Sequence, residues 1–288
     1  MESAGVRRSP FAGTWYPGDP SELDATISHL LASAPRSEPP GPMGPMGPMG
    51  KLVALISPHA GLRYSGPVAA AGFRLLEGQA FESIILLGPS HRVSFDALAT
   101  YPAGAFATPL GLAVIDSDLA RSFESATPRA RPIPEVHRGE HCLEMQLPFL
   151  QHLLPQARIL PVMMGTQSAC NIEAAATALA RAVSASNYPV LLIASSDLSH
   201  YENRDRARAL DSEVLDRLER FDSRGLAELL EEERGHACGG GPMVAVMMAA
   251  RELGAAASRI LAYGDSGDVN GETDAVVGYV SAALYGAA

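Results

Sequence analysis

Short apolar runs of strand length alternate with longer Ala- and Leu-rich stretches from residue 52 onwards. The runs are almost continuously apolar, which is typical of strands covered on both faces by helices. This pattern predicts an α/β fold, a three-layer sandwich around a mainly parallel or mixed central sheet. The expected strands are LVALIS (52–57), SIILLG (83–88), RILPVMM (158–164), PVLLIAS (189–195), RILAYG (259–264) and VVGYVSAAL (276–284), and the expected helices cover 66–77, 142–153, 171–185, 203–219, 223–233 and 241–253.

The region before residue 52 differs in composition from the rest of the chain. Residues 38–50, EPPGPMGPMGPMG, contain Pro and Gly at a density that sustains neither helix nor sheet, so we expect an exposed loop there. Ahead of it, SELDATISHLLASA predicts a helix capped by Ser21. A chain of 288 residues can bury one large core or two smaller ones. We expect a single domain over residues 1–288.

Composition and charge argue against several classes of function. A formal net charge of -10, without clusters of Lys and Arg, argues against nucleic acid as a partner. The apolar stretches are shorter than the roughly 20 residues of a membrane span, and no signal-peptide pattern follows Met1, so we expect a cytoplasmic protein with no membrane contact. The 3 cysteines form no CxxC pair, which favours a reduced compartment and an inert role for Cys142 and Cys170.

Three of the expected strands are followed by a polar cluster that contains a histidine. LVALIS leads to His59, SIILLG leads to His91, and PVLLIAS leads to Asp197 and His200. Because ligands of open α/β sheets bind beyond the carboxyl ends of parallel strands, we expect these side chains to share one site. His59 and His91 follow their strands most closely and are the best metal-ligand pair. His200, beside Asp197, is better placed for proton transfer.

Two further segments carry groups that bind metals or move protons. HRGEHCLEMQLPFL (137–150) supplies Glu140, His141 and Glu144 just before an expected helix, where carboxylates are also favourable without any function. HACGGGPMVAVMMAA (236–250) places Cys238 ahead of a glycine run that opens an apolar helix. The helix dipole and a bound metal would favour the thiolate of Cys238, and the glycines would admit close approach of a ligand to the backbone.

At these residues the chain resembles the Memo family, a branch of the superfamily that contains the class III extradiol dioxygenases of the protocatechuate 4,5-dioxygenase type. The resemblance spans almost the whole chain. It rests on the ordered blocks AGTWYPG (12–18), SPHAGLRYSGPVAA (57–70), LLGPSHR (86–92), EHCLEMQLPFLQ (140–151), PVMMG (161–165), SSDLSH (195–200) and CGGGPM (238–243).

The resemblance implies one transition-metal ion held by His59, His91 and Cys238. Fe(II) is the first expectation, with copper or zinc as alternatives. It also implies AMMECR-type and radical-SAM proteins as partners. The expected neighbours of the metal are the proton-transfer residues His200, Asp197 and His141, and the residues expected to contact a small-molecule or peptide ligand are Trp15, Tyr16 and Glu144.

These expectations favour a dioxygenase-like, metal-dependent oxidoreductase that acts on an unidentified substrate. Extradiol dioxygenases hold Fe(II) with two histidines and a carboxylate, whereas Cys238 stands here where that carboxylate would be, so ring cleavage is not simply inherited. The alternative is a non-catalytic metal- or peptide-binding module with a redox or signalling role. Zinc-assisted hydrolysis is a third hypothesis, since zinc lowers the pKa of bound water.

Overall fold

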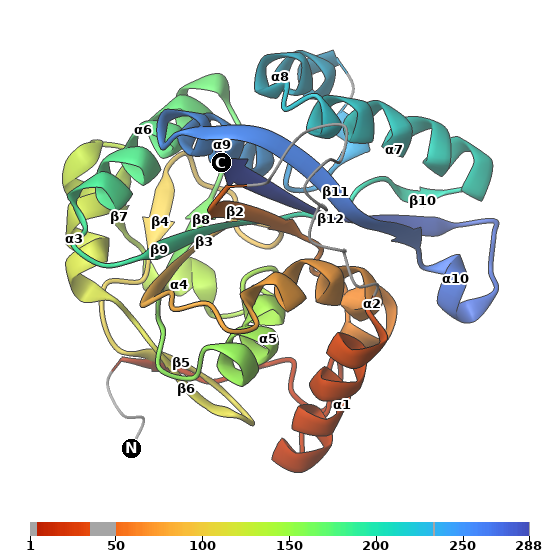
Figure 1. Ribbon diagram of the computed structural model, residues 1–288, viewed down its shortest axis with the longest axis horizontal. Coiled ribbons are helices and arrows are strands. Elements are labelled where there is room, and N and C mark those ends of the chain that lie inside the picture. The colour runs from red at the N-terminus through yellow and green to blue at the C-terminus, as the bar shows by residue number, and fades with distance from the viewer. Residues whose placement is uncertain (1–4, 35–49, 233, 288) are drawn as a thin grey trace.

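The computed structural model describes residues 5–34, 50–232 and 234–287, and it confirms the α/β class (Figure 1). Four parallel strands form the middle of the central sheet: β2 (Leu52–Ser57), β9 (Val190–Ser195), β3 (Ser83–Pro89) and β8 (Arg158–Met164). All four were expected from their apolar runs. Except for Gly50, the expected loop at 38–50 lies outside the described residues.

Antiparallel strands extend this parallel centre on both sides, so the sheet is mixed. Within the described residues it has nine strands in the order β10-β12-β2-β9-β3-β8-β4-β7, and β11 pairs with β12. The added strands are β10 (His200–Glu202), β11 (Ala255–Asp265), β12 (Val276–Gly286), β4 (Leu98–Thr100) and β7 (Ala130–Pro132). The apolar carboxyl-terminal strand β12 therefore lies inside the sheet, between β11 and β2.

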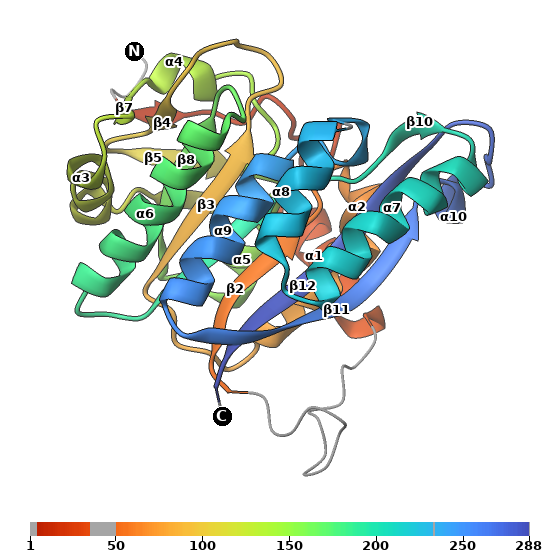
Figure 2. The same cartoon turned by 90° about the horizontal axis from the view of Figure 1, so that it is seen from above.

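The continuous apolar runs are explained by burial on both faces of the sheet. In β3, Ile85 and Leu87 belong to one core cluster, whereas Ile84 and Leu86 belong to the other. Helices cover each face (Figure 2). The first cluster includes residues of α3 (Ser117–Ala126), α6 (Ala169–Ala185), α7 (Arg204–Glu219), α8 (Ser223–Glu232) and α9 (Gly240–Glu252), and the second includes residues of α1 (Pro20–Ser33), α2 (Leu62–Phe73) and α5 (Leu147–Leu153).

Several predicted boundaries were wrong, and α3 and most of the short elements were not predicted. The first helix is capped by Asp19, whose side chain accepts hydrogen bonds from the amides of Ser21 and Glu22, so Ser21 is inside the helix. The predicted helix at 142–153 begins as a 3₁₀ turn at Glu144–Gln146. The unpredicted elements are β1 (Val6–Arg7), β4, β5 (Ala105–Thr108), β6 (Gly111–Val114), β7, β10, α3, α4 (Pro134–His137) and α10 (Gly267–Asn270). In the described part of the chain, no helix is both long and apolar enough to cross a bilayer.

A buried arginine ties the amino-terminal segment to the rest of the fold. Arg7 lies in β1, which pairs with β5, and its guanidinium donates to the Glu144 carboxylate at 2.5 Å. It also donates to the carbonyl oxygens of His137 and Glu140, both at 2.6 Å. The other Glu144 oxygen accepts a hydrogen bond from the Tyr16 hydroxyl at 2.6 Å. Arg7 and Glu144 therefore form a buried ion pair with its remaining hydrogen bonds satisfied.

Arg7→Ala should lower the free energy of unfolding by about 3–5 kcal/mol, because it leaves the Glu144 carboxylate buried without its partner. Urea unfolding measures this change. Arg8→Ala, at an exposed neighbour, is the matched control and should change stability by less than about 0.5 kcal/mol. Equal losses in the two variants would show that the ion pair does not hold the segment.

His137 lies in the same buried region and is uncharged at neutral pH. Burial lowers the pKa of His137 from 6.5 to about 3. Its Nε2 atom is 3.2 Å from the carbonyl oxygen of Ala99, which can only accept, so Nε2 carries the proton. In the unfolded chain the same imidazole titrates near its ordinary pKa. Between these two pKa values the unfolded state binds one more proton than the folded state.

This difference predicts that stability falls as the pH drops below about 6.5, by about 1.4 kcal/mol per pH unit from His137 alone. His137→Gln should remove that contribution and give a flatter profile, which urea unfolding between about pH 7 and about pH 5 would detect. His29→Gln, at an exposed histidine, is the control, and its unfolding free energy should depend on pH with the same slope as that of the native chain. Parallel profiles for the native chain and His137→Gln would contradict the assignment.

Candidate functional site

The carboxyl ends of three neighbouring parallel strands meet at one edge of the sheet. His59, His91 and Asp197 each follow the last residue of their strand, β2, β3 and β9, by two positions. Ser57 and Ser195 are in register, and the Asp197 carboxylate accepts a hydrogen bond from the backbone N–H of His59 at 2.7 Å. The strand ends therefore bring these segments together as their positions in the sequence predict.

Three histidines come together above this edge. One donor nitrogen from each of His59, His91 and His141 lies within 4.8 Å of the others. The ring centroids of His91 and His141 are 4.6 Å apart, and each lies 5.2 Å from that of His59. His141 comes from the loop before the 3₁₀ turn at Glu144–Gln146, so it reaches the site from outside the sheet. Such a cluster suits a transition-metal ion.

Hydrogen bonds fix the tautomer of His59. The Ser195 hydroxyl donates its proton to the carbonyl oxygen of Cys142 at 2.7 Å and accepts from the Gln146 amide at 2.9 Å. Its remaining contact, to His59 Nδ1 at 2.9 Å, must therefore be donated by the ring. Burial, together with the nearby His141 and His91, holds the pKa of His59 well below its ordinary value. His59 is therefore neutral, with the Nε2 lone pair available.

A single carboxylate orients the other two histidines. Glu140 is 3% exposed and lies 2.9 Å from Nδ1 of His91 and 3.0 Å from Nδ1 of His141. It also accepts hydrogen bonds from the backbone N–H groups of both residues, at 2.7 and 2.9 Å. Burial alone would raise the pKa of the Glu140 carboxyl, but the hydrogen bonds from His141 and His91 outweigh it and hold that pKa well below its usual range. Both Nδ1 atoms therefore carry protons, and both Nε2 atoms are available.

Cys238 contacts His59 but is not one of the three residues whose donor atoms all lie within 4.8 Å of one another. Its Sγ is 3.2 Å from His59 Nε2 and accepts a hydrogen bond from the backbone N–H of Asp197 at 3.3 Å. Burial, then the Asp197 carboxylate, raises the pKa of the Cys238 thiol, so in the absence of a cation the thiol is protonated and donates to Nε2. The sequence predicted that the helix dipole would favour the thiolate. Burial outweighs that effect, so metal binding at Cys238 would release a proton.

The glycines after Cys238 serve close packing within the protein. A Cβ on Gly239 would lie 2.4 Å from the carbonyl oxygen of Ser195, and one on Gly240 would lie 2.5 Å from Cδ1 of Leu230. A Cβ on Gly241 would meet the Gln167 side chain at 2.9 Å. A side chain at any of these positions would therefore clash with the protein's own atoms, whereas the backbone of Gly240 and Gly241 still lines a cavity.

A cavity of about 780 Å³ opens in front of the histidines. Trp15 forms one wall, with its ring centroid 4.6 Å from that of His141. Arg63 and Arg92 also line the cavity, and within the described residues neither has a carboxylate at ion-pair distance. The residues at its wall that were expected from the sequence are Trp15, His59, His91, His141, Asp197 and His200.

His200 is oriented by the backbone. Its Nδ1 lies 2.8 Å from the carbonyl oxygen of Leu198, so Nδ1 donates and Nε2 is the basic nitrogen of the neutral ring. The sequence places Asp197 close to His200, which it predicts to transfer protons. In the structure the Asp197 carboxylate instead binds the His59 amide, and burial raises its pKa.

Tyr16 and Glu144, both expected to contact the ligand, lie behind the cavity. Tyr16 is 3% exposed and Glu144 is fully buried, and both belong to the cluster around Arg7. Their contacts hold the amino-terminal segment that carries Trp15. Sequence reasoning did not identify Ser195, Gln146, Arg63 and Arg92. It named Glu140 as a group that binds a metal or moves protons, with a purely structural role as the alternative, and did not predict that it orients two histidines.

The whole chain has recognisable relatives. A family model described as Memo-like protein matches residues 7–283. A MEMO1 family protein from Methanopyrus kandleri is 34% identical over 96% of this chain and 98% of its own length, and one from Nitrosopumilus maritimus is 33% identical over 95% and 98%. An uncharacterized protein from Escherichia coli K12 has a similar fold, with a TM-score of 0.50 at 12% identity, over 79% of this chain and 99% of its own. The chain therefore belongs to the Memo family.

Proposed function

We propose that this protein is a metal-dependent oxidoreductase whose ion is held by His59, His91 and Cys238, with His141 beside them. The observation that supports it is the tautomer pattern: hydrogen bonds to Ser195 and Glu140 place the proton of all three rings on Nδ1, and the lone pair of His59 Nε2 faces the Cys238 thiol at 3.2 Å. Two or three imidazoles with one thiol suit iron, copper and zinc, and Fe(II) is the ion we propose first. When bound, such an ion supplies redox or Lewis-acid chemistry.

The residues around the cavity indicate what the protein itself would contribute. The guanidinium groups of Arg63 and Arg92 favour an anionic substrate group, such as a carboxylate. Trp15 offers an aromatic face for an apolar or aromatic body. Nε2 of His200 takes a proton from the substrate or returns one to it, while the Leu198 carbonyl keeps the ring in a single orientation.

Elemental analysis of anaerobically purified protein tests the metal assignment. We expect near-stoichiometric iron in the native chain and little in His59→Ala, because that change removes the central Nε2. Loss of a hydrogen bond that supports a metal ligand weakens metal binding roughly 10- to 100-fold. Cys238→Ser removes a ligand itself and should weaken metal binding by more than this, most strongly for copper(I). His141→Ala should keep most of the metal, and Cys170→Ser, at an exposed cysteine, is the control.

Two outcomes would contradict this assignment. If metal is lost in His141→Ala but retained in Cys238→Ser, the third ligand is His141 and not the thiol of Cys238. No metal in any preparation, even after reconstitution with iron, copper or zinc, would leave a metal-free binding module as the function that the cavity supports.

Turnover is tested separately from metal binding. Oxygen uptake with 3,4-dihydroxybenzoate as a probe substrate should be metal-dependent, and His200→Gln should reduce it by about 10²- to 10⁴-fold without changing the metal content, because the group that moves the proton is lost. His152→Gln, which changes a histidine on α5 paired with Asp24, is the control. Equal rates in native and His200→Gln protein would remove the proposed role. A metal-loaded chain without turnover on a panel of aromatic acids would favour the non-catalytic module.

A further inference from the structure

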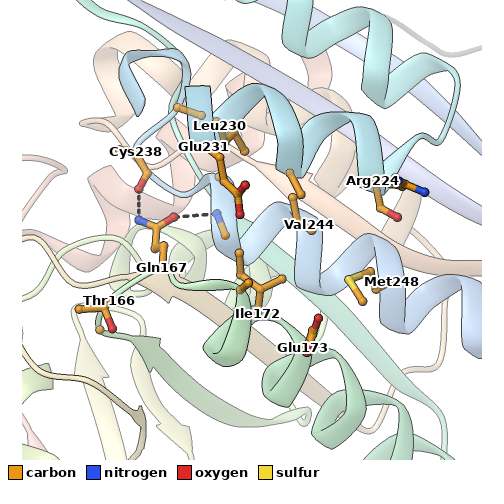
Figure 3. A pocket seen from close by; sticks show the side chains of 17 residues that line it. Thr166, Gln167, Ile172, Glu173, Arg224, Leu230, Glu231, Cys238, Val244 and Met248 are labelled. Carbon is orange, nitrogen blue, oxygen red and sulfur yellow. Dashed lines mark hydrogen bonds between the residues drawn. The ribbon is translucent and has the colours of Figure 1, made fainter. Parts of the chain in front are cut away.

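A second cavity, of about 540 Å³, lies between α6, α8 and α9 (Figure 3). The segment of Cys238 separates it from the cavity with the histidines. The thiol of Cys238 faces His59, whereas its carbonyl oxygen accepts a hydrogen bond at 2.7 Å from Gln167, which lines the second cavity. The two cavities therefore open on different sides of the same loop.

Apolar side chains from three helices line much of this second cavity. Ile172 of α6, Ala227 and Leu230 of α8, and Met248 of α9 are only partly buried, although all four pack against the large core cluster on this face of the sheet. Figure 3 shows Ile172, Val244 and Met248 directed towards a common space between the helices. A ligand that covers the remaining apolar surface of these side chains removes it from water, which favours binding.

The rim of the cavity carries unbalanced negative charge. Glu173 of α6 and Glu231 of α8 line it from opposite sides, and neither has an ion-pair partner in the part of the chain that the structure describes. Arg224, the cation at this rim, is paired with Glu228 on its own helix at 2.9 Å. The charge that the cavity offers to a ligand is therefore negative.

The wall near Cys238 is already in place without a ligand. The Gln167 side chain donates to the Cys238 carbonyl and accepts from the backbone N–H of Gly241 at 2.6 Å, so both ends of its amide are satisfied. Leu230 covers Gly240 so closely that a Cβ there would clash. Such a preformed site loses little conformational freedom on binding.

We propose that this cavity is a second binding site, which takes a small amphiphilic cation with an apolar alkyl or aryl body and an ammonium head. The body lies on Ile172, Val244 and Met248, and the ammonium lies between the carboxylates of Glu173 and Glu231. The volume falls in the range of roughly 300–1,000 Å³ that is typical of small-molecule sites. The proposed site differs in charge from the histidine cavity, where two arginines favour an anion.

Three probes of nearly equal shape test the proposal on the full chain: 4-phenylbutylamine, 4-phenylbutan-1-ol and 4-phenylbutanoate. Methyl-labelled methionine provides the NMR readout, with the Met248 signal assigned from a Met248→Leu spectrum. The amine should shift the Met248 signal with saturation and bind roughly 3- to 10-fold more tightly than the alcohol, and the carboxylate should bind most weakly. Equal affinity for amine and carboxylate, or no shift at Met248, would overturn the proposal.

Charge variants test whether the rim carboxylates contribute to binding of the amine separately from the apolar floor. Replacing both rim carboxylates, Glu173→Gln with Glu231→Gln, should weaken the amine roughly 3- to 10-fold and leave the alcohol unchanged. Glu232→Gln, one residue further along α8 and not in the cavity wall, is the matched control and should change neither. Equal weakening of the amine by the control and by the double variant would overturn the proposal.

Trp15, the single tryptophan of the chain, reports on the other cavity. The amine should shift Met248 while the Trp15 indole N–H signal stays in place. A shift of Trp15 alone would assign the amine to the histidine cavity and overturn the proposal. Because Met248 is read independently of the metal, the result also stands apart from the outcome of the metal analysis.

Discussion

The carboxylate of Glu140 is the group on which the arrangement of the candidate site depends most. It is buried, yet it keeps its charge because ring and backbone N–H groups of His91 and His141 are directed at it. The same contacts set the tautomers of both rings and turn each Nε2 lone pair away from the carboxylate. A neutral residue at this position would leave both rings without that constraint. The carbonyl oxygen of Glu140 is in turn bound by Arg7, so the geometry at the histidines depends on the docking of a strand more than 130 residues earlier.

The sequence predicts those site residues that lie at the end of a strand and few of the others. His59, His91 and Asp197 each follow an apolar strand by two positions, and the topology of a parallel sheet is enough to bring them together. No rule of that kind applies to Glu140 or His141, because they lie in a loop whose path is set by tertiary contacts. The Ser195–Gln146 pair, which fixes the tautomer of His59, joins residues 49 positions apart, and nothing local in either segment indicates the contact. Arg63 and Arg92, which line the histidine cavity, carry no sequence signal that distinguishes them from other exposed arginines.

In the fold as well, elements with a local apolar pattern were predictable, whereas elements that depend on contacts with distant residues were not. The four central strands and the long helices other than α3 were predicted within a few residues, because burial on both faces of the sheet leaves a continuous pattern. Strands such as β4 and β7, with 3 residues each, are too short to show a period, and they form because β8 and its neighbours offer free edges. The cap of α1 was misplaced for a subtler reason: Asp19 and Ser21 are both good capping residues, and Pro20 between them is compatible with the first helical position only if Asp19 is the cap.

The loop at Cys238 is held by packing on several sides. Gly239 packs against the end of β9, Gly240 against Leu230 of α8, and Gly241 against Gln167 in the loop before α6, so three separate segments set the position of this loop. Two of these contacts, Leu230 and Gln167, also form the wall of the second cavity. The same loop therefore contributes to both cavities: its backbone packs beside the second one, and its thiol lies 3.2 Å from Nε2 of His59.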